Sequence, residues 1–105
     1  MRAGAMDRTI VFERMTATPD DYGTIVETWA ALATMRAERV RNAIDDALGD
    51  SGSETTATLQ FRTWFFDGLT LDDRVSYEGA AYRIKRIDEI GRRRGLNILV
   101  ERIGP

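Results

Sequence analysis

The sequence predicts a mainly β protein, folded as a small antiparallel β-barrel or sandwich with one long, partly helical middle loop. Short segments rich in β-branched and aromatic residues recur along the chain, and several alternate apolar with polar side chains. Turns marked by Gly, Asp or Pro separate these segments. A chain of 105 residues can hold one modest core, so we expect a single domain over residues 1–105 with a loop insertion at 41–55.

The first predicted unit is a hairpin. Residues 8–15 place Ile10 and Phe12 on one face of a strand. The stretch that follows contains a Pro, two Asp and a Gly, each of which favours a turn. Residues 24–29 then form a returning strand, and we expect Trp29 to pin that strand into the barrel.

A second short strand and the middle loop come next. Residues 34–40 alternate weakly and are predicted as a strand, although their Ala and Arg content also suits a helix. Residues 41–54 break the pattern. Asn42 can cap a short helix that Gly49 would end, so we expect one or two helical turns followed by a loop.

Residues 56–66 are the strongest predicted strand. One face carries Leu59, Phe61 and Phe65, and the other carries Gln60, Arg62, Trp64 and Phe66. Three consecutive aromatic residues on a strand cannot all face one core. We therefore expect Trp64 or Phe66 to contact a neighbouring protein, since aromatic side chains dominate interface energetics.

The C-terminal part is predicted to form three strands joined by tight turns. Residues 74–77 and 80–90 flank a Glu78–Gly79 turn, which is typical of a hairpin. A second turn at 91–95 contains three arginines, and residues 96–103 close the chain as the last strand. Clustered arginines can bind phosphates, but we favour a solvated turn or ion pairs with a neighbouring subunit.

Composition excludes several classes of function. The chain has no Cys and no His, so thiolate zinc sites and Ser-His or Cys-His nucleophile pairs are excluded. Neighbouring carboxylates in the sequence point to different faces, so we predict no catalytic, cofactor-binding or metal-binding residues. The formal net charge of -2 gives no overall attraction to nucleic acid, and no apolar run is long enough to span a membrane.

The order of these pieces resembles a known family. The matching elements are a D-x-Y-G turn at 20–23, a strand that ends at Trp29, the stretch 31–40, the run "LTLDDRVSYEGAAYRI" at 69–84, and an Arg-rich turn followed by an alternating strand at 91–103. Within the run, the residues in step with the family are Asp73, Arg74, Val75, Tyr77, Gly79, Tyr82 and Ile84. The chain is similar to the phage head-tail joining family of long-tailed phages, also called head-closure or stopper proteins. Prophages and gene transfer agents carry similar proteins.

The resemblance implies a structural, non-enzymatic role without a cofactor. Such a protein is a subunit of a ring, a hexamer or dodecamer on the connector, that closes the DNA-filled head. The ring lies below the portal and adaptor, and it offers a docking face to the tail terminator or tail tube. Packaged DNA passes through its channel. The chain would be made in the bacterial host cytoplasm and would end in a virion or phage-like particle.

The resemblance also assigns residues. The expected channel loop comprises Arg41, Asn42, Ile44, Asp45, Asp46, Leu48, Asp50 and Glu54. The expected contacts with ring neighbours or other connector proteins comprise Trp64, Phe66, Arg92, Arg93 and Arg94. Two alternatives stay open at this point: another connector or tail-completion ring protein, or a small β-barrel that binds nucleic acid.

Overall fold

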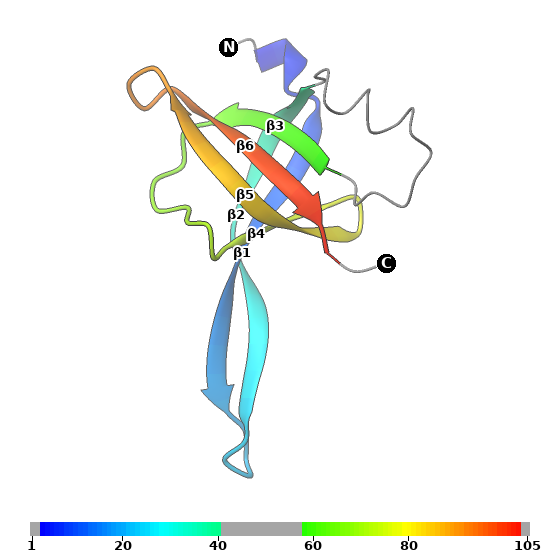
Figure 1. The fold of residues 1–105 in the computed structure, drawn as a ribbon, viewed down its shortest axis with the longest axis vertical. Coiled ribbons are helices and arrows are strands. Elements are labelled where there is room, and N and C mark those ends of the chain that lie inside the picture. Colours follow the sequence, from blue (N-terminus) through cyan, green and yellow to red (C-terminus); the bar gives the residue numbers. More distant parts are fainter. Residues whose placement is uncertain (1–2, 41–57, 104–105) are drawn as a thin grey trace.

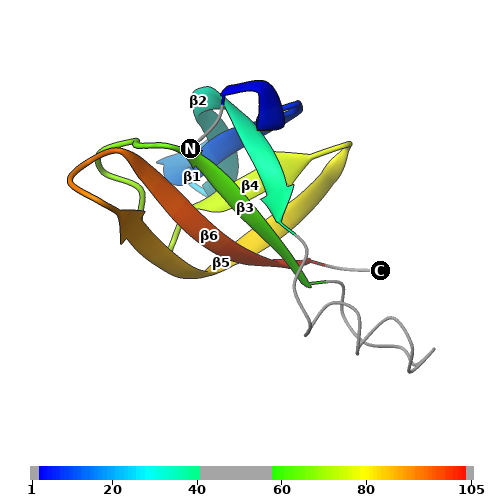
Figure 2. The same cartoon turned by 90° about the horizontal axis from the view of Figure 1, so that it is seen from above.

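The computed structural model describes residues 3–40 and 58–103, and the expected channel loop and its short helix lie outside them. The elements are η1 (Ala3–Ala5), β1 (Arg8–Pro19), β2 (Ile25–Val40), β3 (Thr58–Trp64), β4 (Arg74–Tyr77), β5 (Ala80–Ile90) and β6 (Gly95–Arg102). All strand pairs are antiparallel, and the strands close into a ring in the order β1-β2-β3-β6-β5-β4 (Figures 1 and 2). The predicted mainly β fold is confirmed. Within the described residues no helix is both long and apolar enough to cross a bilayer.

One face of each strand supplies the core inside the ring. Ile10 and Phe12 of β1 are fully buried, as the alternation predicts, and so are Phe61 of β3 and Ile98 of β6. The Phe61 ring meets the edge of Tyr77 on β4, with 4.9 Å between centroids. These contacts join strands from both halves of the chain, so the ring has one shared core.

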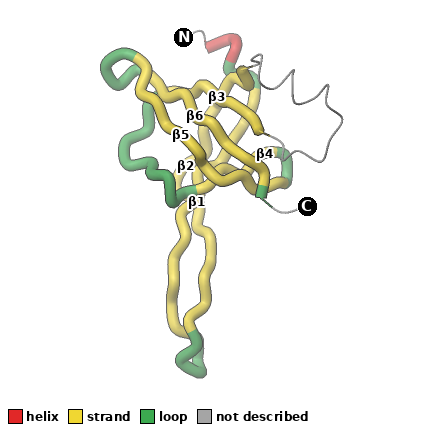
Figure 3. The backbone as a smooth tube through the Cα atoms, in the orientation of Figure 1, coloured by secondary structure: helices red, strands yellow, loops and turns green. Residues whose placement is uncertain are grey.

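A β-bulge divides the first hairpin into two parts. Phe12 pairs with Ala33 and Glu13 with Ala31, which leaves Leu32 as an extra residue on β2. Bulges bend a strand and increase its twist. Beyond the bulge, residues 13–31 leave the ring and extend away from it as a two-stranded ribbon, which we call the projecting hairpin (Figures 1 and 3).

The tip of the projecting hairpin is the turn that the sequence predicts. The Asp20 side-chain oxygen Oδ1 accepts hydrogen bonds from the backbone N–H groups of Tyr22, at 2.8 Å, and Thr24, at 2.9 Å. Gly23 has a φ of 79°, a conformation that costs glycine little. The turn between β4 and β5 is also as predicted, since Glu78 and Gly79 both have positive φ, as the favoured hairpin turns require.

The strand bounds differ from the prediction in two places. β1 runs on to Pro19, and β2 is one continuous strand where the sequence indicated two, because pairing with β1 overrides the helical preference of its alanine-rich middle. β3 ends at Trp64. Its last inward position belongs to Thr63, whose buried hydroxyl donates to the Arg36 carbonyl at 2.7 Å. Phe65 lies beyond the strand and packs against the edge of the core.

Candidate interaction surfaces

A buried carboxylate fixes the base of the projecting hairpin. Asp73, only 2% exposed, lies just before β4 and accepts two hydrogen bonds from Arg14 of β1, from Nε at 2.9 Å and from Nη2 at 3.0 Å. The Thr70 backbone N–H donates to the same carboxylate at 2.8 Å, and Arg14 Nη2 also donates to the Gly68 carbonyl at 2.7 Å. Arg14 and Asp73 therefore tie the hairpin to the loop that joins β3 to β4.

The surroundings of Asp73 favour its charged form. Burial by itself would raise the pKa of Asp73, but the hydrogen bonds from Arg14 and Thr70 and the charge of Arg14 outweigh it and hold the pKa below its ordinary value. The pKa of Arg14 is raised by the hydrogen bond and charge of Asp73. The pair is thus ionised, and its two parallel N–H···O bonds make a directional link.

A second arginine contacts both strands of the hairpin at its base. Arg74 of β4 donates from Nε to Glu13 Oε1 at 2.7 Å, and its guanidinium carbon lies 4.3 Å from the centre of the Trp29 ring. Trp29 is half-buried and pairs with Met15 on the projecting hairpin, outside the core of the ring. The prediction that Trp29 pins its strand into the barrel is therefore wrong in location, because the bulge carries this part of β2 outward. Trp29 instead holds the hairpin base against β4.

Most of the projecting hairpin is exposed, including apolar side chains. Residues directly opposite one another in an antiparallel pair share a face. One face therefore carries the pairs Met15–Trp29, Ala17–Glu27 and Pro19–Ile25; it is apolar except for Glu27, and we call it the apolar face. Met15 is 42% and Ile25 is 62% exposed. A two-stranded ribbon by itself is marginally stable in water, and exposed apolar side chains that lie together on a surface often mark an interaction site.

The second exposed surface is the arginine turn, residues 91–94, between β5 and β6. Its backbone is fixed, because Arg94 N–H donates to the Ile90 carbonyl at 3.2 Å and the Arg94 carbonyl accepts from Phe65 N–H at 3.2 Å. The Arg93 guanidinium carbon lies 5.5 Å from the centre of the Phe65 ring. Among the ion pairs of the described residues, none involves Arg92, Arg93 or Arg94. All three side chains are exposed, so the turn presents three positive charges to solvent.

The two aromatic candidates at the end of β3 differ in placement. Trp64 is 41% exposed and pairs with Gly95, so it lies beside the arginine turn. Phe66 is half-buried, with its ring centre 5.3 Å from that of Phe12. Of the two, Trp64 has the geometry of an interface anchor, and Phe66 closes one end of the core.

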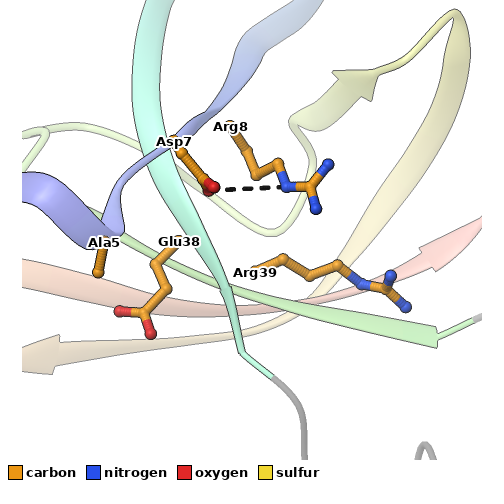
Figure 4. Close-up of a pocket in the computed structure, with 5 residues that line it drawn as sticks. All are labelled: Ala5, Asp7, Arg8, Glu38 and Arg39. Carbon is orange, nitrogen blue, oxygen red and sulfur yellow. Dashed lines mark ion pairs between the residues drawn. The ribbon is translucent and has the colours of Figure 1, made fainter.

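The surface of the described residues is hollowed in several places, and two of these hollows lie beside residues discussed above. The one in Figure 4 encloses about 400 Å³ and is lined by Ala5, Asp7, Arg8, Glu38 and Arg39. Its Arg8 is partnered, lying 3.7 Å from Asp7 and 3.7 Å from Glu78. The other, of about 460 Å³, lies against the hairpin base and is lined by Arg14, Met15, Trp29, Thr70, Asp72 and Asp73. The described residues contain no cluster of acidic side chains suited to a metal ion.

The sequence predicted the hairpin itself and singled out the arginine turn and Trp64, both of which are exposed. It did not predict that the hairpin projects from the ring, nor which residues anchor it. Arg14 and Asp73 are 59 positions apart, and no local pattern connects them.

Comparisons with known proteins agree with this architecture. The fold matches protein SF1141 from Shigella flexneri 2a with a TM-score of 0.70 and 22% sequence identity, over 97% of this chain and 96% of that one. It also matches a chain in the virion of a native gene transfer agent particle, with a TM-score of 0.62 and 15% identity, over 92% and 94% of the two chains. At these identities the likeness concerns the fold alone, and no curated protein matches the sequence.

The profile of one protein family matches residues 1–103, almost the whole length of the chain. The family consists of structural virion proteins and not of enzymes, so the expected non-enzymatic role is confirmed. The resemblance drawn from the turn at 20–23 and the run at 69–84 is confirmed at this level. This chain, a component of the virion, belongs to the family of phage head completion proteins.

Proposed function

We propose that this head completion protein is a subunit of a ring that closes the DNA-filled head below the portal and adaptor and presents a docking face to the tail. The observation that carries the proposal is the projecting hairpin. It is anchored rigidly at its base by Arg14 and Arg74, yet its apolar face is exposed. A structural protein that assembles with others needs an exposed apolar surface of this kind. The described residues contain no group of acidic side chains suited to a metal ion.

The channel loop is the second part of the proposal. Val40 pairs with Gln60, so the chain leaves β2 and re-enters β3 at the same place on the ring. The inserted segment carries Asp45, Asp46, Asp50 and Glu54. Stacked around one axis, these carboxylates would repel the phosphates of DNA and keep it moving freely. Ile44 and Leu48 of the same segment would meet across the axis as an apolar plug.

Deleting the gene tests the proposal. Heads should still package DNA, then lose it and remain without tails, and a plasmid copy of the gene should restore complete particles. Encapsidated DNA is measured as the nuclease-resistant fraction at successive times after packaging. Tailed particles that retain DNA in the deletion strain would contradict the proposal, because another protein would then close the head.

A nucleic-acid-binding module is the second candidate, favoured by the exposed charges of the arginine turn. Arg93 lies over Phe65, so this ring is already occupied and cannot serve as a platform for base stacking. The net charge of -2 also opposes general attraction to DNA. A gel-shift titration of the purified chain with duplex DNA separates the two functions. Strong binding that weakens steeply with salt would favour the nucleic-acid module, and its absence favours the ring subunit.

A further inference from the structure

We propose that the tip of the projecting hairpin of one copy docks on the arginine turn of the next copy. This inference rests on the proposed ring and names the two surfaces that would join its subunits. The two surfaces are unlike in charge and lie at opposite ends of the molecule. The hairpin tip points away from the ring along the longest axis, and the turn between β5 and β6 lies beyond the other side of the ring (Figures 1 and 3).

The outer half of the projecting hairpin is acidic. Asp20, Asp21 and Glu27 are all exposed, and no Lys or Arg occurs between Met15 and Met35. Glu27 lies within the apolar face, opposite Ala17, and Asp20 and Asp21 lie in the turn just beyond it. A partner for this surface needs positive charge around an apolar contact, since charge complementarity sets which surfaces meet.

The arginine turn has the complementary composition. Arg92, Arg93 and Arg94 lie within a stretch, from Gly91 to Val100, that contains no acidic residue. Trp64, exposed beside the turn, supplies an aromatic side chain of the kind that most often anchors an interface. The same chain therefore carries both halves of a charged and apolar contact.

The geometry favours a head-to-tail contact over a symmetric dimer. Pairing two hairpin tips across a two-fold axis would bring six carboxylates together, and pairing two arginine turns would bring together six guanidinium groups; like charges in such contacts repel. A hairpin-to-turn contact joins unlike surfaces, and repeated contacts of that kind generate a closed ring when the rotation between copies closes. The seven hairpin residues of each strand span about 20 Å at about 3.3 Å per residue, so the hairpin can reach past its own ring to a neighbour.

Cross-linking tests the contact directly, because the chain has no cysteine of its own. Tyr22→Cys at the hairpin tip, where the side chain is 93% exposed, is combined with Arg92→Cys on the turn. Particles that carry the double variant are treated with a short bismaleimide and analysed on a denaturing gel. A ladder of covalent multimers up to the ring size is expected. Particles assembled from equal amounts of the two single variants should yield covalent dimers and nothing larger, since each copy then carries one reactive end.

The control pairs Tyr22→Cys with Ile103→Cys, an exposed position beyond the other end of β6. It should produce no ladder. If particles contain the double variant but yield no multimers, or if the thiol introduced at position 22 links only to a different protein, the inference is overturned and the proposed ring stands on its own. Particles that are complete without any copy of the chain overturn the proposed function itself, so the two failures are distinguishable.

A charge exchange provides a second measurement. Glu27→Arg and Arg93→Glu, each alone, should lower the number of copies per particle several-fold by placing like charges in contact. The two changes together in one chain restore opposite charges and should restore incorporation. Failure of the double variant to recover, although the protein is folded by circular dichroism, would overturn the docking of hairpin on turn.

Discussion

Asp73 illustrates at the scale of one residue how a structural protein uses a buried charge. Its carboxylate accepts bonds from Arg14 of the projecting hairpin and from the Thr70 backbone of the preceding loop. A buried ion pair is weak evidence for stability, because desolvation offsets much of the attraction. Such a pair is strong evidence for positioning, since its geometry is bidentate and directional. We therefore interpret Asp73 as the residue that sets the angle of the hairpin.

Asp73→Asn removes the charge with little change of shape. The variant should lose about 1–3 kcal/mol of unfolding free energy, because Arg14 then keeps only neutral acceptors at a buried site. Urea denaturation followed by fluorescence of Trp29 and Trp64 measures the loss. Glu101→Gln, which breaks the more exposed pairs with Arg83 and Lys85, is the matched control and should cost under about 1 kcal/mol. Equal losses in the two variants would contradict this role.

The same carboxylate predicts an acid dependence. The pKa of Asp73 is lower in the folded chain than its ordinary value of 3.8, so its contribution is fully present above that value and is lost as the pH falls through the lower, folded pKa. The stability difference between the natural chain and Asp73→Asn should therefore shrink below about pH 3.8. Denaturation midpoints measured from about pH 6 down to about pH 2.5 check this expectation, and a constant difference would contradict it.

How well single residues could be predicted depended on whether their role was local. Ile10, Phe12 and Phe61 follow from alternation, because a strand with one buried face imposes a period of two. Asp73 and Arg74 belong to a recognisable motif, but that motif does not indicate their partners on β1. Those contacts depend on the closure of the ring, which brings β4 beside β1.

The projecting hairpin dominates at the scale of the element. Its first strand pairs with β4 of the ring as far as Glu13, and the bulge at Leu32 turns the two strands outward. Its base is held by two arginines, and its outer part makes contacts mainly across its own two strands, such as Thr16 Oγ1 to Thr28 Oγ1 at 3.0 Å. We expect the outer part to open locally far more easily than the ring.

Trp29→Ala should loosen the hairpin without unfolding the ring. The change removes the ring on which Arg74 stacks, so backbone amides of the outer hairpin should exchange with deuterium several-fold faster. Amides of β6 should keep their rates. Hydrogen exchange read by mass spectrometry measures both regions at once. Tyr22→Ala, at the exposed tip, is the control and should change neither.

Elements were predicted correctly where the pattern was strong and missed where it was weak. β4, β5 and β6 and their turns match the expected ranges closely, because Glu78–Gly79 and Gly91 mark the bends. The continuity of β2 could not be predicted, since its alanine-rich middle also suits a helix and only pairing with β1 decides it. For the same reason no local pattern indicated that a hairpin would leave the ring.

At the scale of the whole molecule, the chain has an acidic, apolar hairpin at one end and a basic turn at the other. Such asymmetry suits a subunit of the proposed ring, because each head-to-tail contact in a ring of more than two copies joins two different surfaces. The long axis of 49 Å is due in large part to the hairpin. In the proposed ring, the hairpin would carry the contact of each copy to the next.

Replacing all three residues of the arginine turn tests this asymmetry. Arg92→Glu, Arg93→Glu and Arg94→Glu together should leave the melting temperature within a few degrees. None of the three has an ion-pair partner among the described residues, and the contact of Arg93 with the Phe65 ring lies at an exposed site, where it is worth about 0.5–1 kcal/mol. The yield of DNA-retaining particles should nevertheless fall at least tenfold. Arg86→Glu on β5 is the control, since its side chain is exposed and its ion pair within the described residues is with Asp88. Normal particle yield from the triple variant would contradict the role of the turn.

An electron cryomicroscopy reconstruction of the junction between head and tail tests most directly whether copies of this chain form a ring that closes the head. If this chain closes the head, the reconstruction will show a closed ring of its copies on the channel axis, between the adaptor and the first tail protein, with the six-stranded fold recognisable in each copy. The segment between β2 and β3 should face the channel. The proposed head-closure ring would be contradicted by density for this chain on the capsid shell. It would also be contradicted if complete particles had no copy of this chain at the junction.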